Sequence, residues 1–150
     1  LKFDKAPRQK NLTELSIEDV QRAWCNDLVQ VGAQYTMKGD FHARAAELVD
    51  NNYAYAIRPV LFKPGEARLE QFRTSRDGAI SYFVGRDERF PEDWGFALRP
   101  WREARYANAG VIINRGQGLA IGNVFYSDGL GVQRKAEFAM GFIKDREGTV

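Results

Sequence analysis

The sequence predicts one α+β domain, with helices first and a curved antiparallel sheet after them. The chain has 150 residues, which is the size of a single domain. Its first half carries apolar residues at helical spacing, and its last third carries alternating segments separated by regular turn signals. Helices followed by a meander of strands favour an α+β fold over a parallel α/β sheet.

Two amphipathic helices are predicted near the N-terminus. In the first, Ser16 followed by Asp19 resembles a capping box, and Gly39 ends the helix. In the second, His42 lies off the apolar side, which favours a solvated first-turn residue over a catalytic base. The apolar positions recur at steps of three or four and are Ile17, Val20, Trp24, Leu28, Val31 and Tyr35 in the first helix and Phe41, Ala45, Leu48 and Val49 in the second.

The middle of the chain predicts a short strand, a third helix and a surface loop. Pro59 and Pro64 bracket the strand, at residues 60–62. The helix covers residues 75–84, with Gly85 as its stop. Residues 86–95 are charged and include a proline, which predicts a surface loop with Trp94 folded inward.

The last third predicts three strands, at residues 96–114, 119–126 and 132–144. Asn108-Ala-Gly110 interrupts the first of them, which indicates a bulge or sharp bend. The third alternates apolar and polar residues, as expected of a sheet with one covered face. A bent sheet with helices across it encloses a cone, whose wide end leaves a mostly apolar pocket with a few polar groups.

Composition narrows the classes of function. The net charge is only +2, from 22 basic and 20 acidic residues, and the basic residues do not cluster, so we expect no nucleic-acid partner. No apolar run approaches the roughly 20 residues that span a bilayer, so we expect no membrane span. Cys25 and His42 are the single cysteine and histidine, too few for a typical catalytic metal site. We therefore expect no metal and no cofactor, and a buried thiol at Cys25.

Nine short motifs carry a resemblance to a known family. They are Val60-Leu-Phe-Lys-Pro64, Gln71-Phe-Arg73, Ser81-Tyr-Phe-Val-Gly85, Phe90-Pro-Glu-Asp93, Gly95-Phe-Ala-Leu98, Pro100-Trp101, Asn108-Ala-Gly110, Gly122-Asn123 and Lys144-Asp145. In this order they resemble the iota-class carbonic anhydrases of bacteria, cyanobacteria and algae. That family belongs to the nuclear transport factor 2-like superfamily and is similar to the association domain of calcium/calmodulin-dependent protein kinase II. The resemblance runs from about residue 17 to residue 148.

The resemblance implies a cone fold and metal-free, reversible hydration of carbon dioxide, with bicarbonate held in the pocket. The family's polar groups are a threonine, a tyrosine and a His-His-Ser-Ser motif. Tyr82 matches the tyrosine, and its phenol could donate a hydrogen bond to bicarbonate or its transition state. Gly65 falls on the threonine position and has no hydroxyl. The His-His-Ser-Ser motif does not occur in these residues and would lie on a strand after Val150.

Other candidate pocket residues follow from their types and positions. Tyr53 and Tyr55 close the second helix, and Trp101 opens the sheet. Tyrosine and tryptophan combine an apolar body with a hydrogen-bonding tip, which suits a pocket wall. Simple core packing is the alternative for all three, as it is for Tyr82, which could merely anchor the third helix to the sheet.

Two functions of different classes remain open from the sequence. One is a metal-independent carbonic anhydrase, with carbon dioxide and bicarbonate as its small-molecule partners. The other is a catalytically degenerate family member that serves as an assembly domain or subunit of a larger complex. The match around Tyr82 favours the first, and Gly65 favours the second. Binding of another small carboxylate or apolar ligand has only the superfamily as support, and fold does not fix function.

The sequence also gives expectations for the domain limits, assembly and location of the protein. Residues 1–14 are expected to form a flexible leader, and residues 15–150 a single domain that lacks its last strand. The turn signal at residues 145–148 suggests that the polypeptide continues past Val150 or that a partner supplies a strand. The resemblance implies a homodimer through the outer sheet face, with Phe125 or Tyr126 in the contact, or a place in a larger complex. It also implies the chloroplast, or alternatively the bacterial periplasm.

Overall fold

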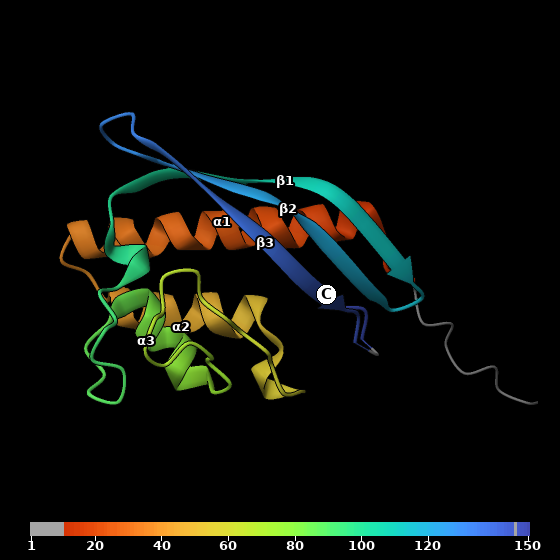
Figure 1. The fold of residues 1–150 in the computed structure, drawn as a ribbon, viewed down its shortest axis with the longest axis horizontal. Helices are drawn as coiled ribbons and strands as arrows, with labels where there is room; N and C mark the ends of the chain where they lie inside the picture. Colours follow the sequence, from red (N-terminus) through yellow and green to blue (C-terminus); the bar gives the residue numbers. More distant parts are fainter. Residues whose placement is uncertain (1–10, 146) are drawn as a thin grey trace, which may run out of the picture.

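Helices precede an antiparallel sheet in the computed structural model, which describes residues 11–145 and 147–150 (Figure 1). The sheet has the order β1-β2-β3, and this arrangement confirms the predicted α+β class. The helices are α1 (Glu14–Thr36), α2 (Phe41–Asn52) and α3 (Arg76–Val84), with short 3-10 turns η1 (Ala54–Ala56) and η2 (Phe96–Leu98). The strands are β1 (Trp101–Asn114), β2 (Gln117–Asp128) and β3 (Gln133–Ile143).

Helix α1 buries Ile17, Trp24, Leu28 and Val31 of the predicted stripe, whereas Val20 is half-buried and Tyr35 is exposed. The helix begins earlier than expected. The backbone N–H of Ser16 donates to Thr13 Oγ1 at 3.1 Å, and the N–H of Thr13 donates to Ser16 Oγ at 3.0 Å. The capping box is therefore Thr13–Ser16 and not Ser16–Asp19. Leu12 is buried with Ile17, so part of the expected leader belongs to the folded domain. Residues 1–10 of that leader lie outside the described residues.

Helices α2 and α3 form as predicted. The apolar positions Ala45, Leu48 and Val49 of α2 are buried, while His42 is exposed. Helix α3 starts after Ser75, whose Oγ accepts a hydrogen bond from the N–H of Gly78 at 3.2 Å. It ends at Gly85, where φ is +68° and an added Cβ would lie 2.9 Å from the Asp93 carbonyl oxygen. Only glycine suits that position.

Two predictions for the middle of the chain were wrong. Residues 60–62 form an extended loop with a single bridge, Phe62 to Arg73, because the flanking prolines lack the donors that a longer ladder needs. The side chain of Trp94 is not folded inward but 89% exposed. The residue that turns inward is its neighbour Asp93, whose carboxylate pairs with the buried Arg73.

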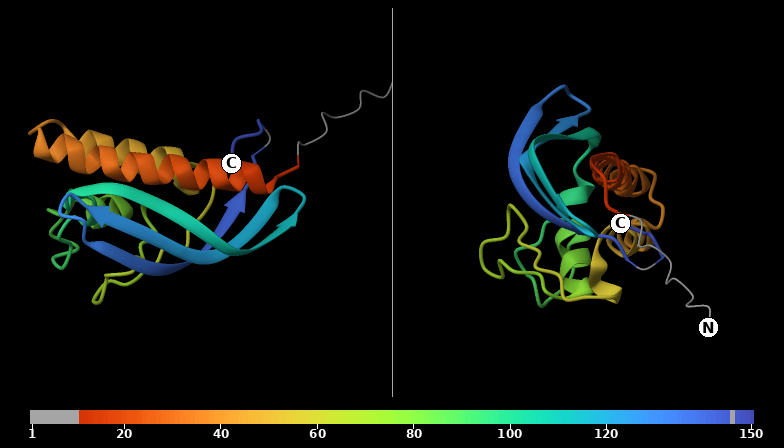
Figure 2. Two further views of the ribbon diagram at one scale, coloured as in Figure 1. Left: turned by 90° about the horizontal axis from the view of Figure 1, so that it is seen from above. Right: turned by 90° about the vertical axis from the view of Figure 1, so that its right-hand side faces the viewer.

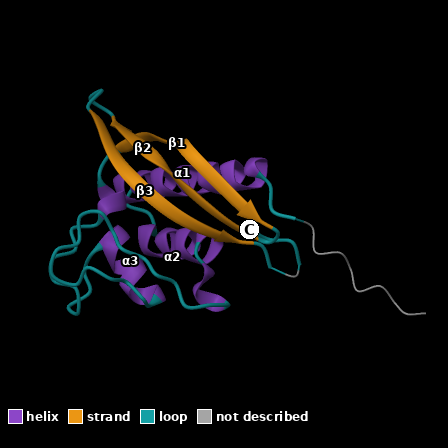
Figure 3. Ribbon diagram, turned by 45° about the vertical axis from the view of Figure 1, so that its right-hand side comes forward, coloured by secondary structure: helices purple, strands orange, loops and turns teal. Residues whose placement is uncertain are grey.

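The sheet bends over α1, and its curvature has a local cause (Figure 2). The β1–β2 register shifts between Trp101 and Glu103 and again between Asn108 and Gly110. The second shift is the predicted bulge. Opposite it, Gly122 leaves room for the bulge, since an added Cβ would lie only 2.1 Å from the Ala107 carbonyl oxygen. Figure 3 shows the strands as one bent layer, with α1 packed against it and α2 and α3 farther from the strands.

The two faces of the sheet differ as the alternation in β3 predicted. Phe138 and Phe142 face the core, while Lys135 and Glu137 are exposed. In β2, Tyr126 is 8% exposed and packs in the core. This register leaves Phe125, not Tyr126, for the outer face, where Arg105 lies 4.1 Å from its ring. Other apolar residues on exposed parts of the strands are Ile112, Leu119 and Ile121.

Within the described residues, none of the helices has the length and apolar character needed to cross a membrane.

Candidate functional site

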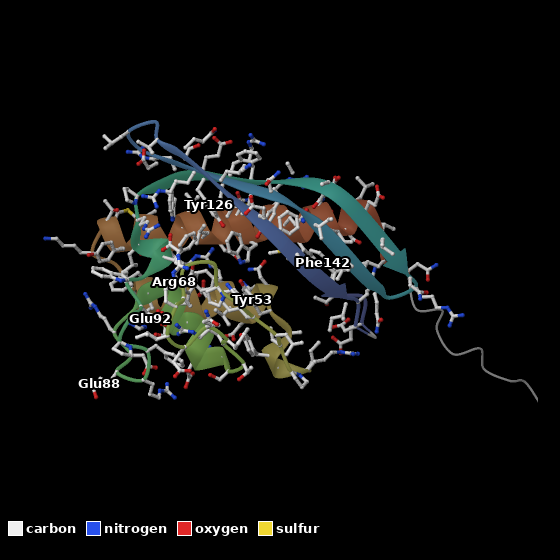
Figure 4. All side chains as sticks on the ribbon, viewed as in Figure 1. Tyr53, Arg68, Glu88, Glu92, Tyr126 and Phe142 are labelled. Carbon is white, nitrogen blue, oxygen red and sulfur yellow. The ribbon has the colours of Figure 1, made fainter. Side chains whose placement is uncertain are left out.

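A cavity of about 1120 Å³ lies between the inner face of the sheet, the helices and the loop at residues 60–66. Figure 4 labels Tyr53 and Tyr126, which reach this region from opposite layers of the fold. Most of the wall is aromatic or aliphatic, as is usual for a small-molecule site. Its aromatic members are Trp24, Tyr53, Phe62, Tyr82, Phe83, Phe96, Trp101, Tyr106, Tyr126, Phe138 and Phe142.

Tyr82 belongs to this wall and is held there by other rings. It is 8% exposed, its ring stacks on Phe96 with the ring centres 5.4 Å apart, and the centre of the Phe62 ring lies 5.8 Å away in an edge-to-face arrangement. Burial raises the pKa of the phenol, the Glu66 carboxylate raises it further, and a contact with the Glu66 backbone opposes the rise. Tyr82 therefore stays protonated at neutral pH, in the state that donates a hydrogen bond.

The structure brings Gly65 and Tyr82 together, because the residue after Gly65 is the one that approaches the Tyr82 phenol. Gly65 also lines the cavity. An added Cβ at this glycine would meet no heavy atom within 4 Å among the described residues. The position expected to carry a threonine in the family thus has room for a larger side chain.

The two remaining tyrosine candidates are placed differently. Tyr53 lines the cavity, and its hydroxyl accepts a hydrogen bond from Trp24 Nε1 at 3.1 Å. Tyr55 stacks on Tyr53 at a ring distance of 6.1 Å, but it is not among the residues that line the cavity. Its hydroxyl donates to the Arg73 carbonyl oxygen at 2.6 Å. Tyr55 is therefore placed to support the loop behind the wall.

Trp101 forms part of the wall with its ring. It is 5% exposed, and its Nε1–H donates to the Phe96 carbonyl oxygen at 2.9 Å. Because that donor is already used within the protein, Trp101 contributes an apolar surface and not a polar contact.

Sequence reasoning missed Tyr106 and Tyr126 as cavity residues. Both line the cavity, and Tyr126 packs on Phe96 and Trp101 at ring distances of 5.3 and 5.2 Å. Burial raises the pKa of both phenols, and the other tyrosines around the cavity, including Tyr82 and Tyr53 for Tyr126, raise it further. The alternation of residues along a strand could have indicated them, but it assigns a residue to the inner or outer face of the sheet only when the register and the bulges are known.

Charged groups also border the cavity. Arg99 forms a two-pronged ion pair with Glu66, in which Nη1 and Nη2 each donate to one carboxylate oxygen at 2.8 Å. Other charged residues along the lining are Lys63, Arg134, Lys135 and Glu137.

Cys25 is a buried thiol, as predicted, and burial raises its pKa to about 12. In residues 11–145 and 147–150, no group of three or more His, Cys, Asp or Glu side chains is placed to hold a metal ion.

Comparison with known proteins identifies the family. Residues 15–150 match the family model described as metal-independent carbonic anhydrase. The chain therefore belongs to the family of metal-independent carbonic anhydrases, and the resemblance predicted from its motifs is confirmed.

Two relatives show how close the similarity is. Over 142 residues the chain is 39% identical to a metal-independent carbonic anhydrase of Nostoc sp. (strain PCC 7120), an alignment that covers 93% of this chain and 69% of the relative. It is also similar to a crystal structure of the iota-carbonic anhydrase from a cyanobacterium in complex with bicarbonate. There the TM-score is 0.90 and the identity 38%, over 99% of this chain and 92% of the other.

Proposed function

We propose that this chain catalyses the reversible hydration of carbon dioxide to bicarbonate without a metal ion, as a lyase. The observation that carries the proposal is Tyr82, a buried phenol on the wall of a large, mostly apolar cavity. Family membership and the similarity to a bicarbonate-bound relative support it. We further propose that this cavity is the pocket of a nuclear transport factor 2-like cone.

In the proposed reaction, the apolar rings hold carbon dioxide and a water molecule attacks its carbon. A carbon–oxygen bond forms, one carbon–oxygen π bond becomes an oxygen lone pair, and the attacking water releases a proton to solvent. Negative charge grows on the carbon dioxide oxygen, which accepts a hydrogen bond from the Tyr82 hydroxyl. A donor aimed at developing charge in a shielded site is worth more than in water, because few solvent dipoles screen the interaction.

The metal independence of this reaction can be tested directly. The hydration rate of the purified protein is measured before and after exhaustive chelation, with metal content determined on the same samples. We expect the rate to be unchanged at a metal content far below one ion per chain. Activity that disappears on chelation and returns with zinc would contradict the proposal.

Gly65 favours the second candidate function, a degenerate family member that acts as an assembly domain or subunit. A chain without the threonine hydroxyl has one hydrogen-bond donor fewer in the proposed site. A parent protein that shows no hydration above background, with its fold intact, would favour this candidate.

Self-association through the outer sheet face around Phe125 is a proposal common to both functions, and sedimentation showing only monomer at micromolar concentration would count against it.

Gly65→Thr should increase the hydration rate by about tenfold, since a hydrogen bond to a charged group contributes roughly 1.5–3 kcal/mol. The space around Gly65 accepts the new side chain. The matched control is Gly65→Val, which has the same shape without the hydroxyl. Steady-state hydration kinetics of the parent protein, Gly65→Thr and Gly65→Val test this prediction. Equal rates for the threonine and valine variants would show that the hydroxyl contributes nothing at this position.

A further inference from the structure

Arg73 is a buried cation whose surroundings satisfy it fully. Its side chain is 0% exposed, and its guanidinium lies 4.2 Å from the centre of the Phe90 ring. Nη1 and Nη2 donate to the two Asp93 oxygens at 2.7 and 2.8 Å, and Nε donates to the Glu70 carbonyl oxygen at 2.8 Å. A buried ion pair is weak evidence for stability alone, because desolvation offsets much of the attraction. A two-pronged pair of this kind does fix the relative orientation of the two side chains.

The Asp93 carboxylate has a second partner, which connects it to the proposed site. Ser81 Oγ donates to Asp93 Oδ2 at 2.6 Å. Ser81 is the residue before Tyr82 on α3, and Asp93 is 2% exposed. One carboxylate thus holds both the helix that carries the phenol and the guanidinium of Arg73.

Arg73 in turn holds the neighbouring part of the cavity wall, which contains Phe62. Its backbone N–H donates to the Phe62 carbonyl oxygen at 2.7 Å. Phe62 lines the cavity beside Gly65, and its ring meets the Tyr82 ring nearly at a right angle. The Tyr82 side of the site and the wall at residues 60–66 are therefore joined through Ser81, Asp93 and Arg73.

Two further contacts fix the loop that carries Arg73. The Glu92 carboxylate accepts from the consecutive backbone N–H groups of Arg68, Leu69 and Glu70, at distances of 2.6, 2.9 and 2.8 Å. Figure 4 labels Arg68 and Glu92 at this contact. The Tyr55 hydroxyl donates to the Arg73 carbonyl oxygen. The loop is thus tied at both ends of the stretch from Arg68 to Arg73.

We propose that Ser81, Asp93 and Arg73 form a positioning unit that sets the Tyr82 phenol against the wall at residues 60–66 for carbon dioxide hydration. The proposal rests on the proposed function. None of the three side chains lines the cavity, so they act through Tyr82 and not on substrate. A displacement of a reacting group by about 1 Å can slow a reaction by as much as a hundredfold, so such a unit has a measurable effect.

The test is Ser81→Ala, which removes one hydrogen bond to Asp93 and leaves the Arg73–Asp93 ion pair. We expect kcat for hydration to fall about tenfold with KM little changed, as for lost orientation. In a Tyr82→Phe background the same change should have almost no further effect, because the group that it positions is gone. A parent-like kcat for Ser81→Ala, or the same fold-loss in both backgrounds, would overturn the proposal.

The matched control is Arg76→Ala on the same helix. Arg76 Nε and Nη2 donate to Asp50 at 2.6 and 2.8 Å in an exposed ion pair. This variant removes a side-chain contact of α3 without touching Asp93, and we expect the parent hydration rate. A loss equal to that of Ser81→Ala would mean that any loosening of α3 has the same effect, and the proposal would fail.

Amide hydrogen exchange provides a readout that does not need activity. Ser81→Ala should speed exchange at residues 60–66 as well as in α3, whereas Arg76→Ala should leave residues 60–66 unchanged. Parent-like exchange at residues 60–66 in Ser81→Ala would break the proposed link, whatever the kinetics show. If the parent protein does not hydrate carbon dioxide, the proposed function fails, and positioning for that reaction fails with it. The exchange result then still decides whether the link between the two walls exists.

Discussion

Tyr82→Phe should hydrate carbon dioxide about a hundredfold more slowly than the parent protein, with its fold intact. Removal of one donor to a developing anion typically costs about 3 kcal/mol of transition-state stabilisation, which corresponds to this factor. The fold should survive because phenylalanine keeps the ring that packs on Phe62 and Phe96. The loss should appear mainly in kcat, since the charge that the phenol stabilises grows in the transition state.

Stopped-flow hydration kinetics and a thermal melt, measured on the same preparation, test this expectation. The matched control is Tyr35→Phe, which makes the same chemical change at a tyrosine that is 42% exposed on α1 and outside the cavity. It should keep the parent rate. Equal rates for Tyr82→Phe and Tyr35→Phe would make Tyr82 a packing residue and remove the main support for the proposed chemistry.

Asp93→Ala should destabilise the domain by about 3–5 kcal/mol, the usual effect of removing one partner of a buried ion pair. The variant leaves the buried Arg73 guanidinium without its hydrogen-bonded counter-charge, with only the more distant Glu92 carboxylate at 3.7 Å, and takes the acceptor from the Ser81 hydroxyl. For a domain of this size, the melting temperature should fall by roughly 10 °C.

Denaturant unfolding of Asp93→Ala and Asp50→Ala gives the comparison. Asp50 also accepts a two-pronged ion pair, from Arg76, but both side chains are about half exposed. Exposed pairs contribute little, because water solvates each ion when the other is removed. We therefore expect Asp50→Ala to unfold close to the parent midpoint. Similar midpoints for the two variants would mean that the Arg73–Asp93 pair has no special effect on stability.

The parts of the fold that the sequence predicted are those with a local cause. Helix α3 followed from Ser75 and Gly85, whose capping roles depend only on residues within a few positions. The bulge in β1 followed from Asn108-Ala-Gly110. The wrong orientation of Trp94 has a non-local cause, because the ion pair between Asp93 and Arg73 spans 20 positions. No periodicity marks such a pair.

The same distinction between local and non-local causes applies to the residues of the candidate site. Tyr82 and Gly65 could be named because a family resemblance carries positions from one chain to another, and both line the cavity. Tyr126 could not be assigned to a face, because each bulge changes which residues of paired strands point inward. Tyr55 was named for its type, but its hydroxyl is used by the Arg73 carbonyl. Residue type alone does not say which way a side chain points.

The buried phenols also limit the alkaline range of the fold. Burial raises the pKa of Tyr53, Tyr82 and Tyr126 above 10.0, and that of the Cys25 thiol from 9.0 to about 12. In the unfolded chain these groups ionise at their ordinary values, so base favours the unfolded state. Their contribution to stability is complete below about pH 9 and is lost progressively as the pH rises toward their values in the folded protein. A domain that keeps neutral hydrogen-bond donors in its interior is for that reason sensitive to base.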